Sequence, residues 1–253
     1  MNYRNQEEKS QLIFGIRPII EAVNSGKEIE KVLIQPGLKG DNFGDLKHLL
    51  NKKNIPVQYV PQEKLNRVTS KNHQGVIAYV APIVFGDIEN IIPEVYEKGK
   101  QPFVLILDRI TDVRNFGAIV RTAECAGVDA IVIPSKGSAQ INADALKTSA
   151  GALFKMPVCR VENLKAIIDF LKDSGLDIIA CTEKTDQLFD TVNYTKPLAI
   201  IMGSEEDGIS PEYLKRADYK TKIPLLGSIG SLNVSVAAGV ILFEAVRQRL
   251  KAV

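Results

Sequence analysis

Short apolar runs alternate with amphipathic stretches through the second part of the chain. Six of these runs have the length and composition of buried strands: FVLILD, DAIVIP, MPVCRV, LDIIACT, LAIIMG and KTKIPL. The segments between them follow helical periodicity. Because nearly continuous apolar strands separated by helices are typical of parallel sheets covered on both faces, we predict an α/β domain with a parallel sheet over residues 102–253.

The first 80 residues show a shorter alternation of helices and strands. RPIIEAVNSG and FGDLKHLLNKK predict helices, and EKVLIQ, VQYV and GVIAYV predict strands. We therefore predict a small αβ domain over residues 1–80. Residues 81–101 mix proline, glycine and charge without a long apolar stretch, which predicts a linker with one short helix.

Composition limits the class of protein. The chain has 253 residues, of which 45% are hydrophobic and 25% are charged, as in ordinary globular proteins. No apolar run approaches the roughly 20 residues of a membrane span, and MNYRNQEEKSQL has no signal-peptide core. We therefore expect a cytoplasmic protein that does not associate with membranes.

The cysteines and histidines are few and scattered. Cys125, Cys159 and Cys181 are odd in number and far apart, which favours reduced, mostly buried thiols over a disulfide framework or a zinc site. His48 and His73 are the only histidines. We therefore expect no bound metal.

Charge is distributed unevenly although the net charge is only +2. Residues 1–80 hold twelve Lys and Arg against eight Asp and Glu, whereas the remainder holds 20 against 22. A basic bias at one end would suit a domain that faces RNA, although a solvated lysine-rich surface would give the same pattern.

Three unusual loops follow predicted strands, at the edge of a parallel sheet where ligands bind. The first, RITDVRNFGAIVRTAECAG, offers Asn115 as a helix cap and Gly117 as a point of close approach. Arg121 and Glu124 follow on one stripe of that helix. Taken alone, this segment favours a capped helix with an exposed Arg–Glu pair over a functional site.

The other two loops are MGSEEDGISP and IPLLGSIGSLNVSV. The second of these leads into the last helix, where Ser231 and Asn233 are rival N-caps. Each loop alone could be an ordinary turn, but their joint presence at one sheet edge indicates a binding site. The chain has neither G-x-G-x-x-G after the first of these strands nor G-x-x-x-x-G-K-[ST] anywhere. Glycine-rich backbone beside Ile223, Leu226 and Leu232 instead suits a flat heterocycle, which favours a nucleoside-bearing ligand.

Three segments resemble, in order and spacing, the motifs of the SpoU (TrmH) family of RNA 2′-O-ribose methyltransferases in the SPOUT superfamily. They are RNFGAIVRTAECAGVDAIVIP, IMGSEEDGIS and IPLLGSIGSLNVSVAAGVILFEAVRQR, and with FGIRPIIEAV and NHQGVIAYV the resemblance spans nearly the whole chain. The chain is most similar to the RlmB-type branch, which methylates a guanosine of 23S rRNA. The resemblance implies an S-adenosylmethionine (SAM)-dependent enzyme. It also implies a substrate-binding domain similar to ribosomal protein L30e and a catalytic domain with a C-terminal trefoil knot.

The resemblance also assigns the site residues. Those expected to be catalytic match the polar positions of the three motifs: Asn115 and Arg121, then Glu205, then Ser231 and Asn233. Those expected to bind SAM, largely through backbone, are Gly203, Ile223 and Leu232. One position departs from the pattern, because Glu206 stands where the family often has glycine.

The expected reaction requires little acid–base catalysis by the protein. The sulfonium of SAM makes its methyl group electrophilic, so the protein has to place the ribose 2′-hydroxyl and accommodate loss of its proton. A guanidinium is effectively always protonated, so we expect Arg121 to stabilise a developing alkoxide and hold a phosphate oxygen. Glu205 is expected to orient groups, and the identity of the base is open.

The small-residue face around Val236 and Gly239, followed by the apolar VILFEAV, predicts a homodimer. In the family the active site lies at such an interface. Two alternatives stay open, namely a tRNA ribose 2′-O-methyltransferase, which would keep every motif, and a non-catalytic RNA-binding protein, which would lose its SAM contacts.

Overall fold

The computed structural model describes residues 12–252, which form two compact units. The first unit contains the described residues up to Val84 together with Ile141–Ala143. The second contains Phe85–Gln140 and the described residues from Asp144 onward. Within residues 12–252, no helix combines the length and the apolar character needed to cross a membrane.

The first unit is built on a mixed sheet with the strand order β1-β4-β2-β3. Strand β4 runs antiparallel to β1 and β2, and β3 runs parallel to β2. Helices α2 and α3 share one apolar core with the sheet, and α4 packs on a second cluster around Leu33 and Ile77. The elements are β1 (Leu12–Phe14), α2 (Ile16–Asn24), β2 (Ile29–Ile34), α3 (Asp41–Lys52), β3 (Val57–Tyr59), α4 (Gln62–Val68) and β4 (Val76–Val80).

The second unit contains a parallel sheet with the strand order β10-β8-β9-β5-β6-β7, which confirms the predicted fold class. Each predicted apolar run contributes a strand, except that the last strand lies slightly earlier and is shorter than KTKIPL. It ends at Thr221, before Pro224, which lacks a backbone N–H. The strands are β5 (Phe103–Leu107), β6 (Ala130–Pro134), β7 (Val158–Val161), β8 (Asp177–Cys181), β9 (Leu198–Met202) and β10 (Tyr219–Thr221).

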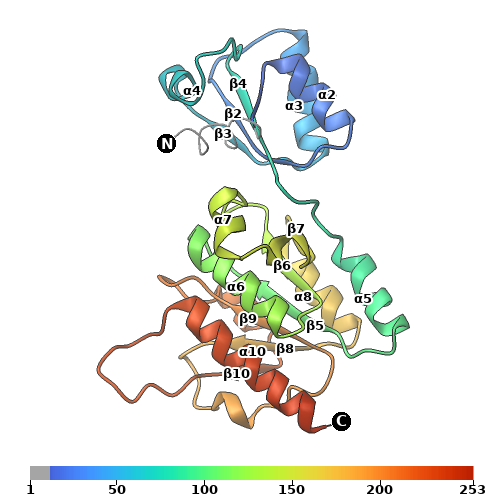
Figure 1. The fold of residues 1–253 in the computed structure, drawn as a ribbon, viewed down its shortest axis with the longest axis vertical. Helices are drawn as coiled ribbons and strands as arrows, with labels where there is room; N and C mark the ends of the chain where they lie inside the picture. The colour runs from blue at the N-terminus through green and yellow to red at the C-terminus, as the bar shows by residue number, and fades with distance from the viewer. Residues whose placement is uncertain (1–11, 253) are drawn as a thin grey trace. The chain divides into compact units, whose positions relative to one another are not determined.

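Helices cover both faces of this sheet. Helices α5 (Ile88–Glu97) and α8 (Leu164–Asp173) share one apolar core with the strands. Helices α6 (Val113–Cys125) and α10 (Val234–Lys251) lie side by side on the opposite face (Figure 1). The remaining elements are α7 (Ala143–Thr148), η1 (Ala152–Phe154), η2 (Phe189–Thr191) and α9 (Pro211–Leu214).

Helix α5 lies in residues 81–101, for which the sequence predicted a linker with one short helix. Its Ile88 and Ile92 are almost fully buried in the core of the second unit. The helix therefore belongs structurally to the parallel-sheet unit, and the division between the units falls at Val84 and Phe85.

The sheet order brings two of the unusual loops together. Strands β5 and β9 are direct neighbours, with Leu107 in register with Met202, so the loops that follow them emerge side by side. Strand β10 lies beyond β8 at the edge of the sheet, and its loop leads into α10. All three loops thus leave the carboxyl ends of parallel strands.

Two glycines in the packing around α6 differ in how much space surrounds them. A Cβ at Gly117 would lie 2.7 Å from Thr148 Cβ and 2.9 Å from the Ala145 carbonyl oxygen, so α6 approaches the end of α7 at this glycine. A Cβ at Gly239 of α10 would lie 3.8 Å from Thr122 Cγ2, an ordinary contact. Close approach therefore requires glycine where α6 meets α7, whereas the contact of α10 with α6 leaves room for a Cβ at Gly239.

These contacts predict opposite outcomes for two glycine-to-alanine changes. Gly117→Ala should lower the free energy of unfolding by about 1–3 kcal/mol, because neither neighbour is the flexible end of a side chain. Gly239→Ala, the matched control, should be neutral or stabilising by up to about 1 kcal/mol, since alanine favours the helix and finds room. Urea unfolding of both variants measures the difference, and equal midpoints would contradict it.

Candidate functional site

Three side chains from the three unusual loops meet at the carboxyl edge of the parallel sheet. Asn115 Nδ2 donates a hydrogen bond to Glu205 Oε1 at 2.8 Å. Asn233 Nδ2 lies within hydrogen-bond distance of both Asn115 Oδ1, at 3.0 Å, and Glu205 Oε1, at 3.1 Å. One carboxylate oxygen is thus shared by two amide groups, which fixes the direction of the Glu205 side chain.

The helix caps differ in part from the prediction. Asn233 does cap α10, because its Oδ1 accepts a hydrogen bond from Ser235 N at 2.9 Å while its Nδ2 reaches the cluster. Asn115 does not cap α6, which corrects the expectation from sequence. Asp112 takes that place, accepting from Asn115 N at 2.7 Å. The amide of Asn115 is therefore left available for Glu205.

A cavity of about 390 Å³ lies next to this cluster. Gly203, Ile223 and Leu232, the residues expected to bind the cofactor, all line it, and so do Ser231 and Glu205. The remaining lining is mixed: its apolar side chains include Met202, Leu225, Val234 and Ala237, and its polar or charged ones include Thr182, Glu183, Lys184 and Lys222. A cavity of this size with both kinds of lining is typical of a site for a small molecule.

A second cavity of about 290 Å³ lies on the other side of the loop after β9. Asn115, Arg109, Thr111 and Asp112 line it. Both cavities share four consecutive residues of the loop as lining: Ser204, Glu205, Glu206 and Asp207. The loop that carries Glu205 is therefore the wall between two cavities.

The sequence suggested that residue 203 is glycine because it binds the cofactor, but the shape of the loop after β9 already requires glycine there. A Cβ at this residue would overlap the backbone of Gly208 and Ile209. The loop leaves β9 and returns so tightly that no side chain fits at its start. Glycine is thus required by the loop itself, whatever occupies the cavity.

Arg121 lies apart from the cluster. It follows Asn115 by six residues on α6, which places it about 9 Å further along the helix and on a different side. The residue is exposed, and within residues 12–252 no hydrogen bond or ion pair holds its side chain. The pairing with Glu124 considered from sequence is absent among these described contacts. The structure therefore brings together Asn115, Glu205 and Asn233 but not Arg121.

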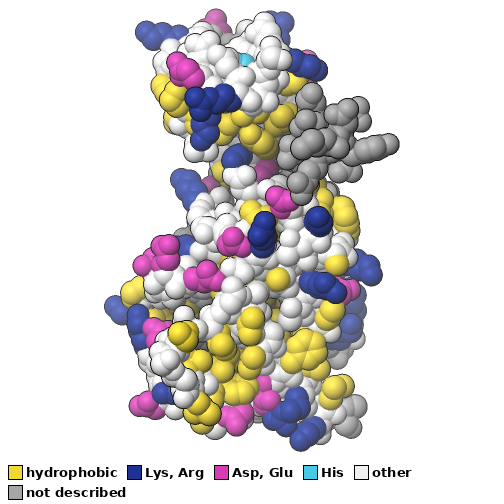
Figure 2. Space-filling view, turned by 60° about the vertical axis from the view of Figure 1, so that its left-hand side comes forward, with side chains coloured by type: hydrophobic (Ala, Val, Ile, Leu, Met, Phe, Trp, Pro, Cys, Tyr) yellow, Lys and Arg dark blue, Asp and Glu magenta, His cyan; other side chains and the backbone are white. Residues whose placement is uncertain are grey.

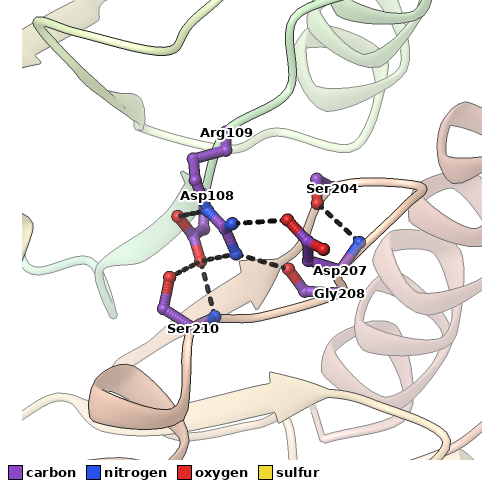
Figure 3. Close-up of polar contacts among 6 residues, drawn as sticks. All are labelled: Asp108, Arg109, Ser204, Asp207, Gly208 and Ser210. Atoms are coloured by element: carbon purple, nitrogen blue, oxygen red, sulfur yellow. Dashed lines mark hydrogen bonds and ion pairs between the residues drawn. The ribbon is translucent and has the colours of Figure 1, made fainter.

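Sequence reasoning missed a second polar cluster beside the site. Asp108, directly after β5, is nearly fully buried and accepts hydrogen bonds from Ser210 N and Ser210 Oγ, both at 2.7 Å. Arg109 donates to Asp108 and to Asp207 of the Glu205 loop (Figure 3). The hydrogen bond to Asp108, joined by the charges of both carboxylates, raises the pKa of Arg109 above its ordinary value. An acid–base pair directly after a buried strand was the available signal.

Two segments that together make up most of the chain match known protein families. Residues 12–84 match the family described as RNA 2′-O ribose methyltransferase substrate binding, and residues 102–243 match the SpoU rRNA Methylase family. A protein of Staphylococcus saprophyticus named as a TrmH family tRNA/rRNA methyltransferase is 36% identical over 238 residues, which cover 94% of this chain and 96% of the relative.

Two solved structures extend the likeness to the fold. The SpoU methyltransferase AviRb from Streptomyces viridochromogenes, in complex with the cofactor AdoMet, gives a TM-score of 0.61 at 26% identity and covers 99% of this chain and 95% of its own. The TrmH/SpoU tRNA modifying enzyme of A. aeolicus gives 0.55 at 32% identity, over 65% of this chain and 85% of its own. Together with the matched family models, these likenesses show that the chain belongs to the SpoU (TrmH) family and is an RNA methyltransferase.

Proposed function

We propose that the chain transfers a methyl group from SAM to the ribose 2′-hydroxyl of a nucleotide in a structured RNA. The observation that carries this proposal is the hydrogen-bonded cluster of Asn115, Glu205 and Asn233, whose Glu205 lies in the wall between two cavities. A guanosine of 23S rRNA is the target we favour, because the motifs most resemble that branch. A ribose in tRNA is the alternative, and the names of the relatives include both kinds of RNA. From the same resemblance we also propose a C-terminal trefoil knot in the second unit and a likeness of the first unit to ribosomal protein L30e.

The larger cavity suits SAM. Its volume of about 390 Å³ lies in the range of small-molecule sites, and the apolar part of its mixed lining suits a flat adenine. Gly203, Ile223 and Leu232 would hold the cofactor there, largely through backbone groups. When bound, SAM supplies an electrophilic methyl group on its sulfonium.

The chain's own side chains then have to place the ribose. Glu205 Oε1 is occupied by two amide groups, so the carboxylate is oriented by Asn115 and Asn233. The two amide groups hold this carboxylate in one direction, which favours an orienting role for Glu205 over proton removal. The smaller cavity, which Asn115 lines, is where we place the incoming nucleotide.

A homodimer would explain the isolation of Arg121. Three exposed apolar residues of α10 recur at seven-residue spacing, Val236, Phe243 and Leu250, with exposed fractions of 52%, 49% and 74%. Residues seven apart lie on one stripe of a helix. Hydrophobic side chains also reach the surface over the second unit, in the lower part of Figure 2. We infer that a second copy covers this stripe, and that Arg121 acts at the site of that copy.

Cofactor binding can be tested within a single loop. Leu232→Ala removes an apolar contact from the wall of the larger cavity and should weaken SAM binding roughly tenfold. Leu226→Ala, in the same loop but outside the cavity lining, is the matched control and should bind SAM normally. Isothermal calorimetry measures both affinities. Equal affinities for the two variants would argue against this placement of SAM.

Substitution of Arg121 tests whether this residue has a catalytic or a structural role. As an exposed residue without an ion pair among the described residues, it should contribute little to stability, and Arg121→Ala should fold and bind SAM normally. Turnover should nevertheless fall by roughly 100-fold or more, since a positioned charge at the developing alkoxide is lost. Methyl transfer from labelled SAM at saturating RNA measures this effect. Wild-type turnover would remove Arg121 from the mechanism.

Mixing two inactive variants tests whether Arg121 acts across the dimer. If it does, a dimer of one Arg121→Ala subunit and one Asn233→Ala subunit has one intact site. After subunit exchange at equal amounts, activity should recover to roughly a quarter of wild type, because half of the dimers are mixed. No recovery, with exchange verified by differently tagged subunits, would place Arg121 and Asn233 in the same subunit's site.

The first unit should supply affinity for RNA. A chain that begins at Phe85, where the second unit begins, should bind SAM normally but lose affinity for the structured RNA substrate. Binding by the full chain should also weaken steeply with salt if several Lys and Arg side chains neutralise phosphates. Filter binding at several salt concentrations, with RNA from a deletion strain, measures both effects. Equal RNA affinity and methylation by the shortened chain would contradict this role.

A further inference from the structure

The loop Gly203–Ser210 is closed upon itself. Ser204 N donates to the Gly208 carbonyl oxygen at 3.1 Å, and Gly208 N donates back to the Ser204 carbonyl oxygen at 3.0 Å. Asp207 N donates to Ser204 Oγ at 3.1 Å. The turn therefore has a defined shape, and Glu205 projects from its outer part toward Asn115 and Asn233.

Three consecutive acids make this turn electrostatically unfavourable by itself. Glu205, Glu206 and Asp207 are all exposed, and like charges so close together repel each other. Among residues 12–252, the ion pair of Arg109 with Asp207 is the one that reaches these acids. Arg109 is thus the cation that offsets the charge of the turn.

Arg109 binds the turn at two points. Its Nη1 donates to Asp207 Oδ2 at 2.9 Å, and its Nη2 donates to the Gly208 carbonyl oxygen at 3.1 Å (Figure 3). Its Nε donates to Asp108 Oδ1 at 3.1 Å. One planar guanidinium thereby connects the end of β5 to the loop that follows β9.

The backbone of Arg109 is held in an uncommon conformation. Its φ of +59° lies in the left-handed region, which residues other than glycine rarely adopt. Such a conformation persists only when the surrounding contacts stabilise it. Asp108 provides such contacts, because its buried carboxylate binds both the Arg109 side chain and Ser210 at the end of the loop.

We propose that Arg109 is a positioning residue that holds the Gly203–Ser210 loop in the shape that binds SAM and aims Glu205 at the reacting ribose. The loop is the shared wall of both cavities, so a shift of the turn would change the cofactor site and the nucleotide site together. This proposal rests on the proposed function of the two cavities.

If Arg109 had only a structural role, its substitution would change stability and not specifically the kinetic constants. The Arg109 side chain is 36% exposed and that of Asp207 is 69% exposed, so water screens the pair and its loss should change overall stability little. Catalysis is more sensitive, since small errors in placement lower the rate of a positioned reaction strongly. Kinetic constants should therefore change where the unfolding transition does not.

The experiment compares Arg109→Ala, Arg109→Lys and Asp207→Asn in the full chain. Arg109→Ala should raise the KM for SAM and lower kcat, each by roughly tenfold, with an unfolding midpoint near that of wild type. Arg109→Lys should restore part of both constants, because it keeps the charge and loses the fork. Asp207→Asn should have a smaller effect, since the hydrogen bond to the Gly208 carbonyl oxygen is kept.

Coupling between the two residues provides the sharper test. If Arg109 acts through Asp207 and Gly208, adding Asp207→Asn to Arg109→Ala should cause no further loss. Lys165→Ala is the matched control, because it breaks a comparable exposed pair, Lys165 with Glu212 at 2.8 Å, on helices outside both cavities. Its kinetic constants should equal those of wild type.

The outcomes separate the two proposals. Unchanged KM for SAM and kcat in both Arg109→Ala and Asp207→Asn, in an enzyme that methylates RNA, would overturn the positioning role alone. A wild-type chain that neither binds SAM nor methylates RNA would instead overturn the proposed function. If Arg109→Ala fails to fold, Asp207→Asn and Arg109→Lys still decide the question, because neither removes a buried group.

Discussion

The candidate site depends on one carboxylate oxygen, Glu205 Oε1, which lies at hydrogen-bond distance from the amides of Asn115 and Asn233. Asn115 lies in the first turn of α6, Glu205 on the loop after β9 and Asn233 at the N-cap of α10, so the three residues come from the segments that follow strands β5, β9 and β10. The cluster can form only because the parallel sheet places β5 beside β9 and all strands end at one edge. The buried core of the sheet thus determines the geometry of an exposed polar site.

Several residues satisfy a folding requirement and a site requirement at once. Asn233 uses its oxygen to cap α10 and its nitrogen to reach Glu205, so one amide satisfies a helix end worth about 1 kcal/mol and also orients the site. Asp112 caps α6 and thereby leaves the Asn115 side chain available. Gly203 permits the tight turn on which Glu205 lies. The fold therefore accounts for these residues without reference to a ligand.

The sequence predicted the features that depend on local pattern. The buried strands of the second unit follow from their apolar runs, and helices α2 and α3 follow from periodicity and their flanking residues. Strand β1 has three residues and α4 seven, too few to show a clear period, and both were missed. The short helix expected within residues 81–101 exists as α5, but the proline and charge of this segment gave no sign that Ile88 and Ile92 bury it in the core. The contact of Arg109 with Asp207 joins residues nearly a hundred positions apart, and no local pattern indicates such a pair.

The fold explains the position of Arg109, which follows β5, but not the position of Arg121 on α6. Arg109 is held by carboxylates and a carbonyl oxygen, in a backbone conformation that these contacts stabilise, so its position follows from the chain itself. Arg121 has no such contact among the described residues, and its long side chain keeps its rotational freedom. Ordering a free arginine has an entropic cost that a bound partner such as a phosphate would have to offset. The fold therefore explains why Arg109 lies where it does, whereas an explanation for Arg121 has to come from the molecules that the chain binds.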